Sequence, residues 1–387
     1  LQEQIVKERR IAPALVLRLK LMSGLDISEK RLPQDGRFSL KVKERKIDVR
    51  LSTMPVEYGE SVVMRLLDQT DGAADLDQVG MAPEMLEQFR RLIHMPHGLI
   101  LVTGPTGSGK TTTLYGALQE LNDAGKKIIT VEDPVEYRLH RVNQVQINTK
   151  IGLSFARILR AALRQDPDIL LVGEIRDQET AEIALRAAMT GHLVLSTLHT
   201  NDAVSSAMRL VDMGAEGFLA ATAIRAVMAQ RLVRRLCDNC YIDYTPNSRE
   251  QAWIRHTMGE QAPVSMSLKQ ASGCHRCNNT GYRGRVGVFE LLVLNDDMAD
   301  ALRRSNSSDF VKAARRSKGY RPLVVSAMME ALTGVTSLEE VYRVAEQIDE
   351  SGDWMQTGLS EGDSASEVYD GLNPEADNRT IAWDDGN

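Results

Sequence analysis

The sequence holds few of the features that mark membrane-spanning, secreted or base-stacking proteins. Only 5% of its 387 residues are aromatic, and only four are cysteine. No apolar run approaches the ~20 residues that a membrane span needs, and no signal peptide precedes the first expected helix. A chain of this length buries a sizeable core without disulfide bonds. We therefore expect a soluble globular protein of roughly two or three domains in the cytoplasm.

Charge of one sign is concentrated at the end of the chain. The net charge is −6, but residues 349–387 alone hold eleven Asp or Glu and one Arg. The rest of the chain has 46 basic and 42 acidic residues, an excess too small to indicate a nucleic-acid surface. The acidic segment is rich in Gly, Ser and Asn, so we predict that it is disordered. Since the first residue is Leu, we expect the sequence to be a piece of a longer protein.

The apolar pattern indicates an α/β protein. Ile11–Met22 has helical spacing, and Phe38–Val42 and Ile47–Leu51 alternate with the period of a strand. Further along, the aliphatic runs LILVTG, KIITVED, DILLVGE and GHLVLSTLH alternate with helical stretches, which predicts a mostly parallel sheet covered by helices. The expected parts are an α+β domain (1–70), a linker (71–83), a P-loop core (84–236), a cysteine-bearing subdomain (237–290), C-terminal helices (291–348) and an acidic tail (349–387).

A Walker A pattern follows the first of these aliphatic runs. Its glycines let the backbone wrap a phosphate, and the loop amides and the next helix, Thr111–Asn122, supply positive potential. Lys110 is expected to reach the β- and γ-phosphates, and the Thr111 hydroxyl to bind Mg²⁺. The predicted nucleotide-contacting residues are Gly104, Pro105, Thr106, Gly107, Ser108, Gly109, Lys110, Thr111 and Thr112.

Carboxylates end two other strands. Glu132, followed by Asp133 and Glu136, ends one run, and Glu174 ends another. Phosphoryl transfer with Mg²⁺ uses a carboxylate beside the metal and a group that orients the attacking water. The pattern does not decide which carboxylate does which; we slightly favour Glu132 as the base and Glu174 as the magnesium partner. On a further run, His199 is placed to sense the γ-phosphate.

The four cysteines form two CxxC pairs. Cys237 and Cys240 are separated from Cys274 and Cys277 by a 33-residue gap. Paired thiolates suit tetrahedral Zn²⁺, whereas neither pair has the βαβ context of a redox motif. We predict one structural zinc that braces a loop-rich subdomain and leaves no open position for catalytic water.

Four segments, in this order, resemble the motor boxes of the type II secretion and type IV pilus assembly ATPases. GPTGSGKTTT, ITVEDPVE, DILLVGEIRD and GHLVLSTLHTND correspond to the Walker A, aspartate, Walker B and histidine boxes. Upstream, Arg31–Arg37, Asp48–Arg50 and Gly59–Arg65 resemble the family's domain before the motor core. The resemblance covers roughly residues 11–347, and within the family the mannose-sensitive haemagglutinin pilus group is the most similar.

This resemblance implies a RecA-like motor that hydrolyses ATP with Mg²⁺ in a hexameric ring. Each nucleotide would lie between Gly104–Thr111 and the first domain, where Arg37, Arg50 and Arg65 match arginine positions that face ATP. The motor would power assembly of a type IV pilus or a type II secretion pseudopilus, peripheral at the bacterial inner membrane and bound to a platform protein. Membrane contact would run only through partners. Cyclic di-GMP would bind only a preceding domain that this sequence lacks.

Other functions stay open on the sequence. In the family, the tetracysteine element marks secretion and pilus-extension ATPases, so a retraction motor is a weaker alternative. A nucleic-acid translocating motor also combines a P-loop with zinc, but the near-neutral body and few aromatics speak against it. Arg231, Arg234 and Arg235 form a small basic cluster, which we interpret as a solvated helix end or partner contact. A scaffold that binds nucleotide without hydrolysis is disfavoured, because no residue needed for turnover is missing.

Overall fold

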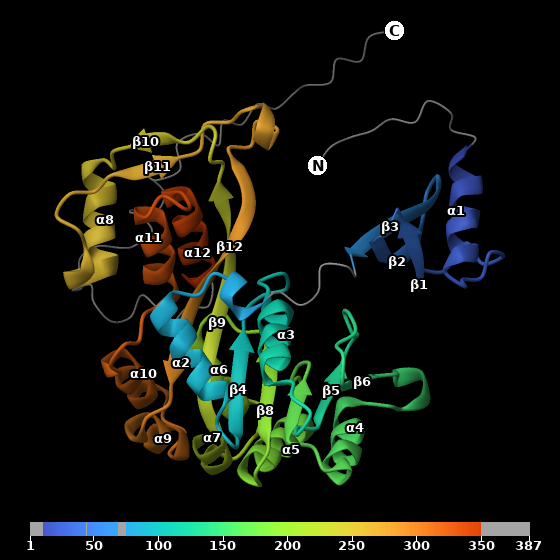
Figure 1. Ribbon diagram of the computed structural model, residues 1–387, viewed down its shortest axis with the longest axis horizontal. Helices are drawn as coiled ribbons and strands as arrows, with labels where there is room; N and C mark the ends of the chain where they lie inside the picture. Colours follow the sequence, from blue (N-terminus) through green and yellow to red (C-terminus); the bar gives the residue numbers. More distant parts are fainter. Residues whose placement is uncertain (1–10, 44, 69–74, 350–387) are drawn as a thin grey trace. The chain divides into compact units, whose positions relative to one another are not determined.

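The computed structural model describes residues 11–43, 45–68 and 75–349, and it confirms the α/β class (Figure 1). The predicted acidic tail from residue 350 onward lies outside the described residues. Within them, no helix has the length and apolar character to cross a membrane. By their internal contacts, the described residues group into a first unit (those within 1–101, 110–197 and 213–225) and a second unit (those within 102–109, 198–212 and 226–387).

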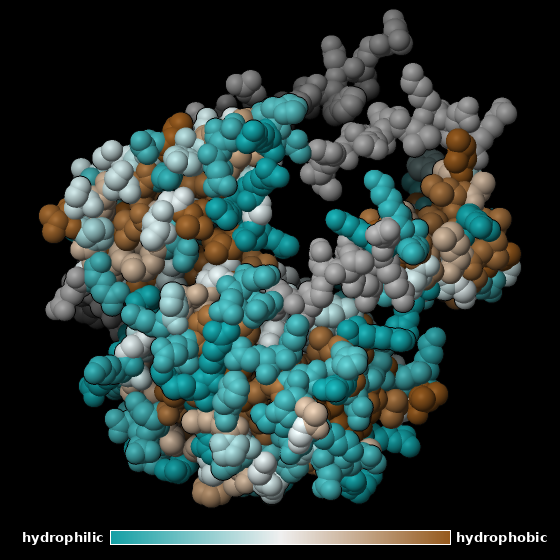
Figure 2. Space-filling model, viewed as in Figure 1, coloured by the Kyte–Doolittle hydropathy of each residue, from teal (hydrophilic) through white to brown (hydrophobic). Residues whose placement is uncertain are grey.

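The N-terminal part of the first unit is a helix and an antiparallel meander. Helix α1 (Ile11–Met22) has the bounds that the sequence predicts, and β1 (Gln34–Val42), β2 (Arg45–Val56) and β3 (Gly59–Asp68) pair in chain order. Val49 and Leu51 of the central strand are buried. Large apolar side chains of α1 and β3 are exposed, and Figure 2 shows this part of the chain with many hydrophobic residues on its surface. Exposed apolar surfaces of this kind are typical of faces that bind another protein.

The central sheet is built on the four predicted aliphatic runs. They form β4 (Gly98–Thr103), β5 (Ile128–Glu132), β7 (Ile169–Val172) and β8 (Leu193–Leu198), and every residue of these strands is buried. With β6 (Val142–Gln146), β5, β7 and β8 pair in parallel, as predicted. Strands buried on both faces read as continuous aliphatic runs rather than alternating ones. The seven-stranded sheet has the order β12-β9-β4-β8-β7-β5-β6.

Two antiparallel strands of this sheet were not predicted. Strand β9 (Ile224–Leu236) pairs with β12 (Tyr282–Val293) over most of their lengths. Most residues of β9 are buried, including Arg231 with 3% of its surface exposed. Arg231, Arg234 and Arg235 thus lie on a strand, and their interpretation as a helix end was wrong; Arg235 alone of the three is exposed, and a partner contact stays a prediction. Charged residues interrupt the apolar run Ile224–Leu236, so its pattern did not predict a strand. In the structure these polar side chains bind neighbouring elements.

Helices cover the sheet and fill the C-terminal part (Figure 1). The helices between residues 83 and 223 are α2 (Pro83–Ile93), α3 (Lys110–Leu121), α4 (Phe155–Ala162), α5 (Gln178–Met189), α6 (Ala203–Asp212) and α7 (Gly217–Ala223). The later elements are β10 (Ile242–Tyr244), α8 (Ser248–Met258), β11 (Leu268–Gln270), α9 (Asp296–Arg303), α10 (Ser307–Arg316), α11 (Leu323–Leu332) and α12 (Leu338–Asp349). The short C-terminal helices match the pattern read from the sequence, and α8, α11 and α12 pack in one apolar core with β12.

Candidate functional site

The phosphate loop of the second unit packs against β9. Gly104 and Gly109 have φ angles of +146° and +90°, values that favour glycine. A Cβ on Gly104 would lie 2.4 Å from the Gln230 carbonyl oxygen, and a Cβ on Gly109 would lie 2.8 Å from the Gln230 side-chain nitrogen. Pro105, Thr106 and Gly107 are exposed at the tip. The two glycines therefore let the loop fit against the strand behind it.

The segment that carries His199 is bound to the residue before this loop. The Thr103 hydroxyl donates to the carbonyl oxygens of Leu198 and Thr200, each at 3.2 Å, and it also contacts the Thr200 hydroxyl. Thr103 directly precedes Gly104. His199 is exposed between the two bound residues. The end of β8 and the start of the phosphate loop are thus held together by one buried threonine.

Helix α3 of the first unit begins at the lysine of the motif. Lys110 is partly buried, and Thr111 and Thr112 are exposed in the first turn. The backbone N–H groups of a first helical turn have no partner within the helix. They point out of its N-terminal end and favour an anion there. Ser108, which precedes them in the second unit, is buried. The lysine and threonines of the motif therefore lie at a helix start, and their contact with phosphate stays a prediction.

Glu132 ends β5 in a set of hydrogen-bond donors. Its carboxylate accepts hydrogen bonds from the hydroxyls of Tyr115 and Thr130 and from the Gln144 amide at 3.2 Å. Only 4% of Glu132 is exposed. Burial and the nearby Glu132 carboxylate raise the pKa of Tyr115, so its hydroxyl stays a proton donor. These three donors fix the orientation of the carboxylate at the strand end.

Glu174 lies at the same edge of the sheet as Glu132. Val131 of β5 is paired with Val172 of β7, and the Gly173 N–H donates to the Val131 carbonyl oxygen at 2.7 Å. The Glu174 carboxylate, in turn, is 2.5 Å from the Arg176 guanidinium. The parallel register therefore places both predicted carboxylates beyond the carboxyl ends of adjacent strands, where open α/β sheets bind ligands.

The three predicted arginines form one row. In the register of the meander, Arg37 is opposite Arg50, and Arg50 is opposite Arg65. All three line a cavity of about 700 Å³, together with Asp133 and residues 146–150. Arg50 donates to Glu136 at 2.6 Å, and Arg37 donates to the Gln146 side chain at 3.2 Å. Like charges directly opposite one another are unfavourable without an anion, so this row is suited to bind one.

The four cysteines have the geometry of a zinc site. Their sulfur atoms lie within 4.8 Å of one another, and the separations of Cys237 from Cys274 and of Cys240 from Cys277 are 3.9 and 3.8 Å. A tetrahedron with Zn–S bonds of about 2.3 Å has S–S edges of about 3.8 Å. Burial would raise the pKa of Cys277, but the N–H groups of Cys274 and Gly281 lower it to about 6. The donor set fits Zn²⁺ and fills the four positions of a tetrahedron.

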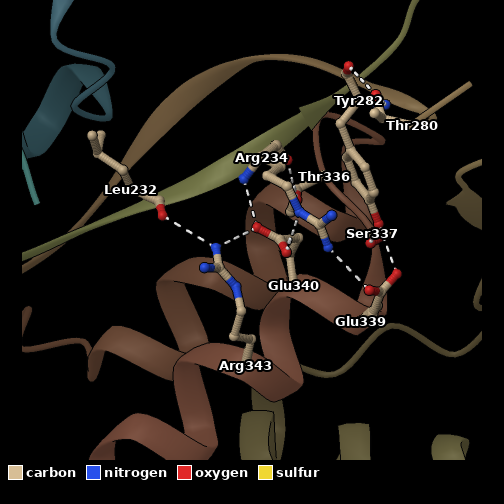
Figure 3. Close-up of polar contacts among 9 residues, drawn as sticks. All are labelled: Leu232, Arg234, Thr280, Tyr282, Thr336, Ser337, Glu339, Glu340 and Arg343. Atoms are coloured by element: carbon tan, nitrogen blue, oxygen red, sulfur yellow. Dashed lines mark hydrogen bonds and ion pairs between the residues drawn. The ribbon is translucent and has the colours of Figure 1, made fainter. Parts of the chain in front are cut away.

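A polar network joins the cysteine loop to α12 (Figure 3). Arg234 donates to Glu340 at 2.8 Å through its side chain and at 2.6 Å through its backbone N–H, and Arg343 donates to the same carboxylate at 2.6 Å. Arg234 also stacks on the Tyr282 ring at 4.0 Å, and Tyr282 donates to Glu339 at 2.9 Å. The buried Glu340 thus holds β9 against α12, beside the strand that leaves the cysteine loop.

Sequence reasoning missed the residues that surround the predicted site. Tyr115, Thr130 and Gln144 orient Glu132, and Gln230 and Arg231 lie behind the phosphate loop. A polar pair inside the apolar run Ile224–Leu236 is the sequence signal that could have indicated Gln230 and Arg231. Thr111 and Glu174 supply the hard oxygen donors that Mg²⁺ prefers, and the magnesium site stays a prediction.

Known proteins resemble this chain over most of its length. The family described as Type II/IV secretion system protein matches residues 1–343. Type II secretion system protein E of Klebsiella pneumoniae is 50% identical over 347 residues, which are 90% of this chain and 68% of the relative. Type II secretion system ATPase E of Vibrio cholerae is 47% identical over 348 residues, with the same coverage. The crystal structure of the pilus retraction motor PilT with bound ADP is 28% identical, with a TM-score of 0.59 over 81% of this chain and 78% of that one.

Proposed function

The chain belongs to the family of type II/IV secretion system proteins, and from this premise we propose that it is an ATPase motor for assembly of a secretion pseudopilus or a type IV pilus. The observation that supports it most is the Walker A loop between β4 and α3, in which Gly104 and Gly109 have φ values that favour glycine and pack against β9 with no room for a Cβ. The reaction is ATP + H₂O → ADP + Pi.

Each step of this reaction can be assigned to particular residues of the chain. Lys110 and the backbone N–H groups of the loop would stabilise phosphate charge, and Thr111 and Glu174 would hold Mg²⁺. When bound, Mg²⁺ neutralises charge on the phosphate oxygens. Glu132, oriented by its three donors, positions the attacking water and accepts its proton. His199 lies on the segment that reports the state of the γ-phosphate.

We infer that the arginine row of the meander also takes part in the reaction with ATP. Guanidinium groups present several N–H donors in a fixed plane, which suits phosphate oxygens in the transition state. Arg37, Arg50 and Arg65 supply three such groups from one row. ATP binding would attract this row, and hydrolysis would release it. Alternate attraction and release is the movement that a motor requires.

The assembled form is a hexameric ring on the cytoplasmic side of the inner membrane, bound to a platform protein. The exposed apolar side chains of α1 and β3 support a contact with a second copy of the chain. A zinc-bound tetracysteine element favours a role in assembly over retraction. The identity of the system served, the relation to the mannose-sensitive haemagglutinin group and the binding of cyclic di-GMP by a preceding domain stay predictions.

The test is ATP hydrolysis measured against protein concentration, with zinc quantified in the same samples. We expect cooperative turnover, at least a hundredfold loss in Glu132→Gln and Glu174→Gln, and one zinc per chain. Nucleotide binding without turnover at any concentration would instead favour the scaffold. Tight DNA binding with a steep salt dependence would favour the nucleic-acid motor.

A further inference from the structure

A buried carboxylate outside the proposed site joins two helices of the second unit. Glu290 lies on β12 opposite Ala229 of β9, and none of its surface is exposed. One carboxylate oxygen accepts the Ala203 N–H at 3.2 Å, and the other accepts the Leu323 N–H at 3.2 Å. Ala203 begins α6 and Leu323 begins α11. The negative group thus lies at two helix N-termini, both of which carry partial positive charge.

Further groups secure this carboxylate. The Tyr320 hydroxyl, three residues before α11, donates to Glu290 at 2.8 Å. Burial and the Asp202 carboxylate raise the pKa of Glu290 to about 7, while the three donors oppose that rise. Burying a carboxylate without partners is costly, so a position with three donors indicates a specific role.

The adjacent strand binds the same segment. Arg231 of β9 is nearly fully buried and donates to the Asn201 carbonyl oxygen at 2.7 Å. Its guanidinium also lies 3.1 Å from the place that a Cβ on Gly104 would take. Asp202 caps α6 by accepting the Ser205 N–H at 2.7 Å. Residues 198–203 are therefore held by Thr103 at one end and by Arg231 and Glu290 at the other.

We propose that Glu290 is a positioning residue of the ATPase reaction, which couples the segment 198–203, and with it His199, to Tyr320 and α11. This inference rests on the proposed function. Because one carboxylate holds both helix starts, a displacement at Tyr320 or α11 changes the hydrogen bond at Ala203. The C-terminal helices then bias the position of His199 without touching nucleotide, and the nucleotide state biases α11 in return.

Two variants test this coupling with a readout other than activity. Glu290→Gln replaces one of the two acceptor oxygens by an amide NH₂ group, and Tyr320→Phe removes one donor and leaves both helix starts bound. Hydrogen–deuterium exchange is measured on the full chain in residues 198–206 and 320–326. We expect exchange in both segments to rise at least threefold in Glu290→Gln and to rise less in Tyr320→Phe. Tyr244→Phe is the matched control, because Tyr244 donates to Glu250 at 2.6 Å elsewhere in the second unit.

Kinetics separate positioning from binding. We expect kcat to fall at least fivefold in Glu290→Gln, with the affinity for ADP unchanged within twofold. Unchanged exchange in residues 198–206, while residues 320–326 exchange faster, would overturn the coupling. If Glu290→Gln does not fold, Tyr320→Phe decides the matter. Unchanged exchange of residues 198–206 in Tyr320→Phe would then overturn the coupling. Absence of turnover in the unmodified protein would contradict the proposed function, and the exchange result would still decide the coupling.

Discussion

The Arg50 guanidinium donates a hydrogen bond to the Glu136 carboxylate, with 2.6 Å between Nη2 and Oε2. Arg50 is also the central member of the row that includes Arg37 and Arg65. A carboxylate and a γ-phosphate present similar oxygen atoms to a guanidinium. Glu136 therefore binds the arginine that we propose for ATP, and the two anions compete for one group.

Replacing Arg50 tests the arginine row. We expect Arg50→Ala to lower the turnover of the assembled enzyme on the order of a thousandfold, the range of a catalytic arginine. The Arg50–Glu136 pair is partly exposed, so the free energy of unfolding should change by less than about 1 kcal/mol. Steady-state kinetics and urea denaturation measure the two effects. Arg91→Ala, in an exposed pair with Glu87, is the control. Equal turnover in Arg50→Ala would remove Arg50 from the site.

Tyr115→Phe tests the orientation of Glu132. Loss of one donor of three leaves the carboxylate less constrained, so kcat should fall about tenfold, equivalent to ~1.4 kcal/mol, with KM unchanged. Tyr137→Phe is the control, because the Tyr137 ring packs on Tyr115 at 4.6 Å between centroids without a described hydrogen bond to Glu132. Stopped-flow measurement of phosphate release gives kcat. The same kcat in both variants would contradict an orienting role for Tyr115.

Removal of zinc should unfold the cysteine loop locally. We expect one zinc per chain by mass spectrometry, and its loss in Cys240→Ser, because three thiolates hold the metal less tightly than four. Exchange in residues 237–244 and 274–282 should then increase. His275 is exposed and lies between two of the cysteines, so His275→Asn is the control and should retain the metal. Full zinc occupancy in Cys240→Ser would exclude this residue as a ligand.

Glu340→Gln should destabilise the junction of β9 and α12. The variant leaves Arg234 and Arg343 without their buried counter-charge, and we expect a loss of roughly 2 to 3 kcal/mol, since breaking such a pair costs ~3 to 5 kcal/mol when both partners are buried. Asp238→Asn removes an exposed partner of Arg235 and should cost less than ~0.5 kcal/mol. Equilibrium unfolding in guanidinium chloride provides both values. Equal losses would contradict the central position of Glu340.

The raised pKa of Glu290 predicts that the free energy of unfolding depends on pH. Burial and Asp202 raise its pKa from 4.5 to about 7 in the folded chain. The folded state then holds a proton that the unfolded state has released, so stability is full below about pH 4.5 and declines as the pH rises to 7. A difference of one between the folded and unfolded pKa values corresponds to ~1.4 kcal/mol in the free energy of unfolding. Unfolding curves between pH 5 and 8 should show a smaller decline in Glu290→Gln. An identical decline would assign it to other groups.

The sequence predicted the parts of the fold in which each local signal points the same way. The strands β4, β5, β7 and β8 are uniformly aliphatic, and the glycines of residues 104–109 have one structural use at the end of a strand. Strand β9 escaped notice because Gln230, Arg231 and Arg234 interrupt its apolar run, and their partners are far away in sequence. Glu290 and Glu340 escaped for the same reason. Polar residues that bind distant backbone groups leave no periodic signal.

The end of β9 and the residue that follows it carry three attachments within eight residues, from Gln230 to Cys237. Gln230 and Arg231 lie against the phosphate loop, Arg234 binds Glu340, and Cys237 is a thiolate of the tetracysteine cluster. Successive strand residues point to opposite faces, so deleting one residue between Arg231 and Arg234 would turn every later side chain over. Insertions or deletions in this stretch should therefore be more damaging than a substitution at any one of its positions. Reporter tags and split sites belong in other parts of the chain, such as the loop around the exposed Val264.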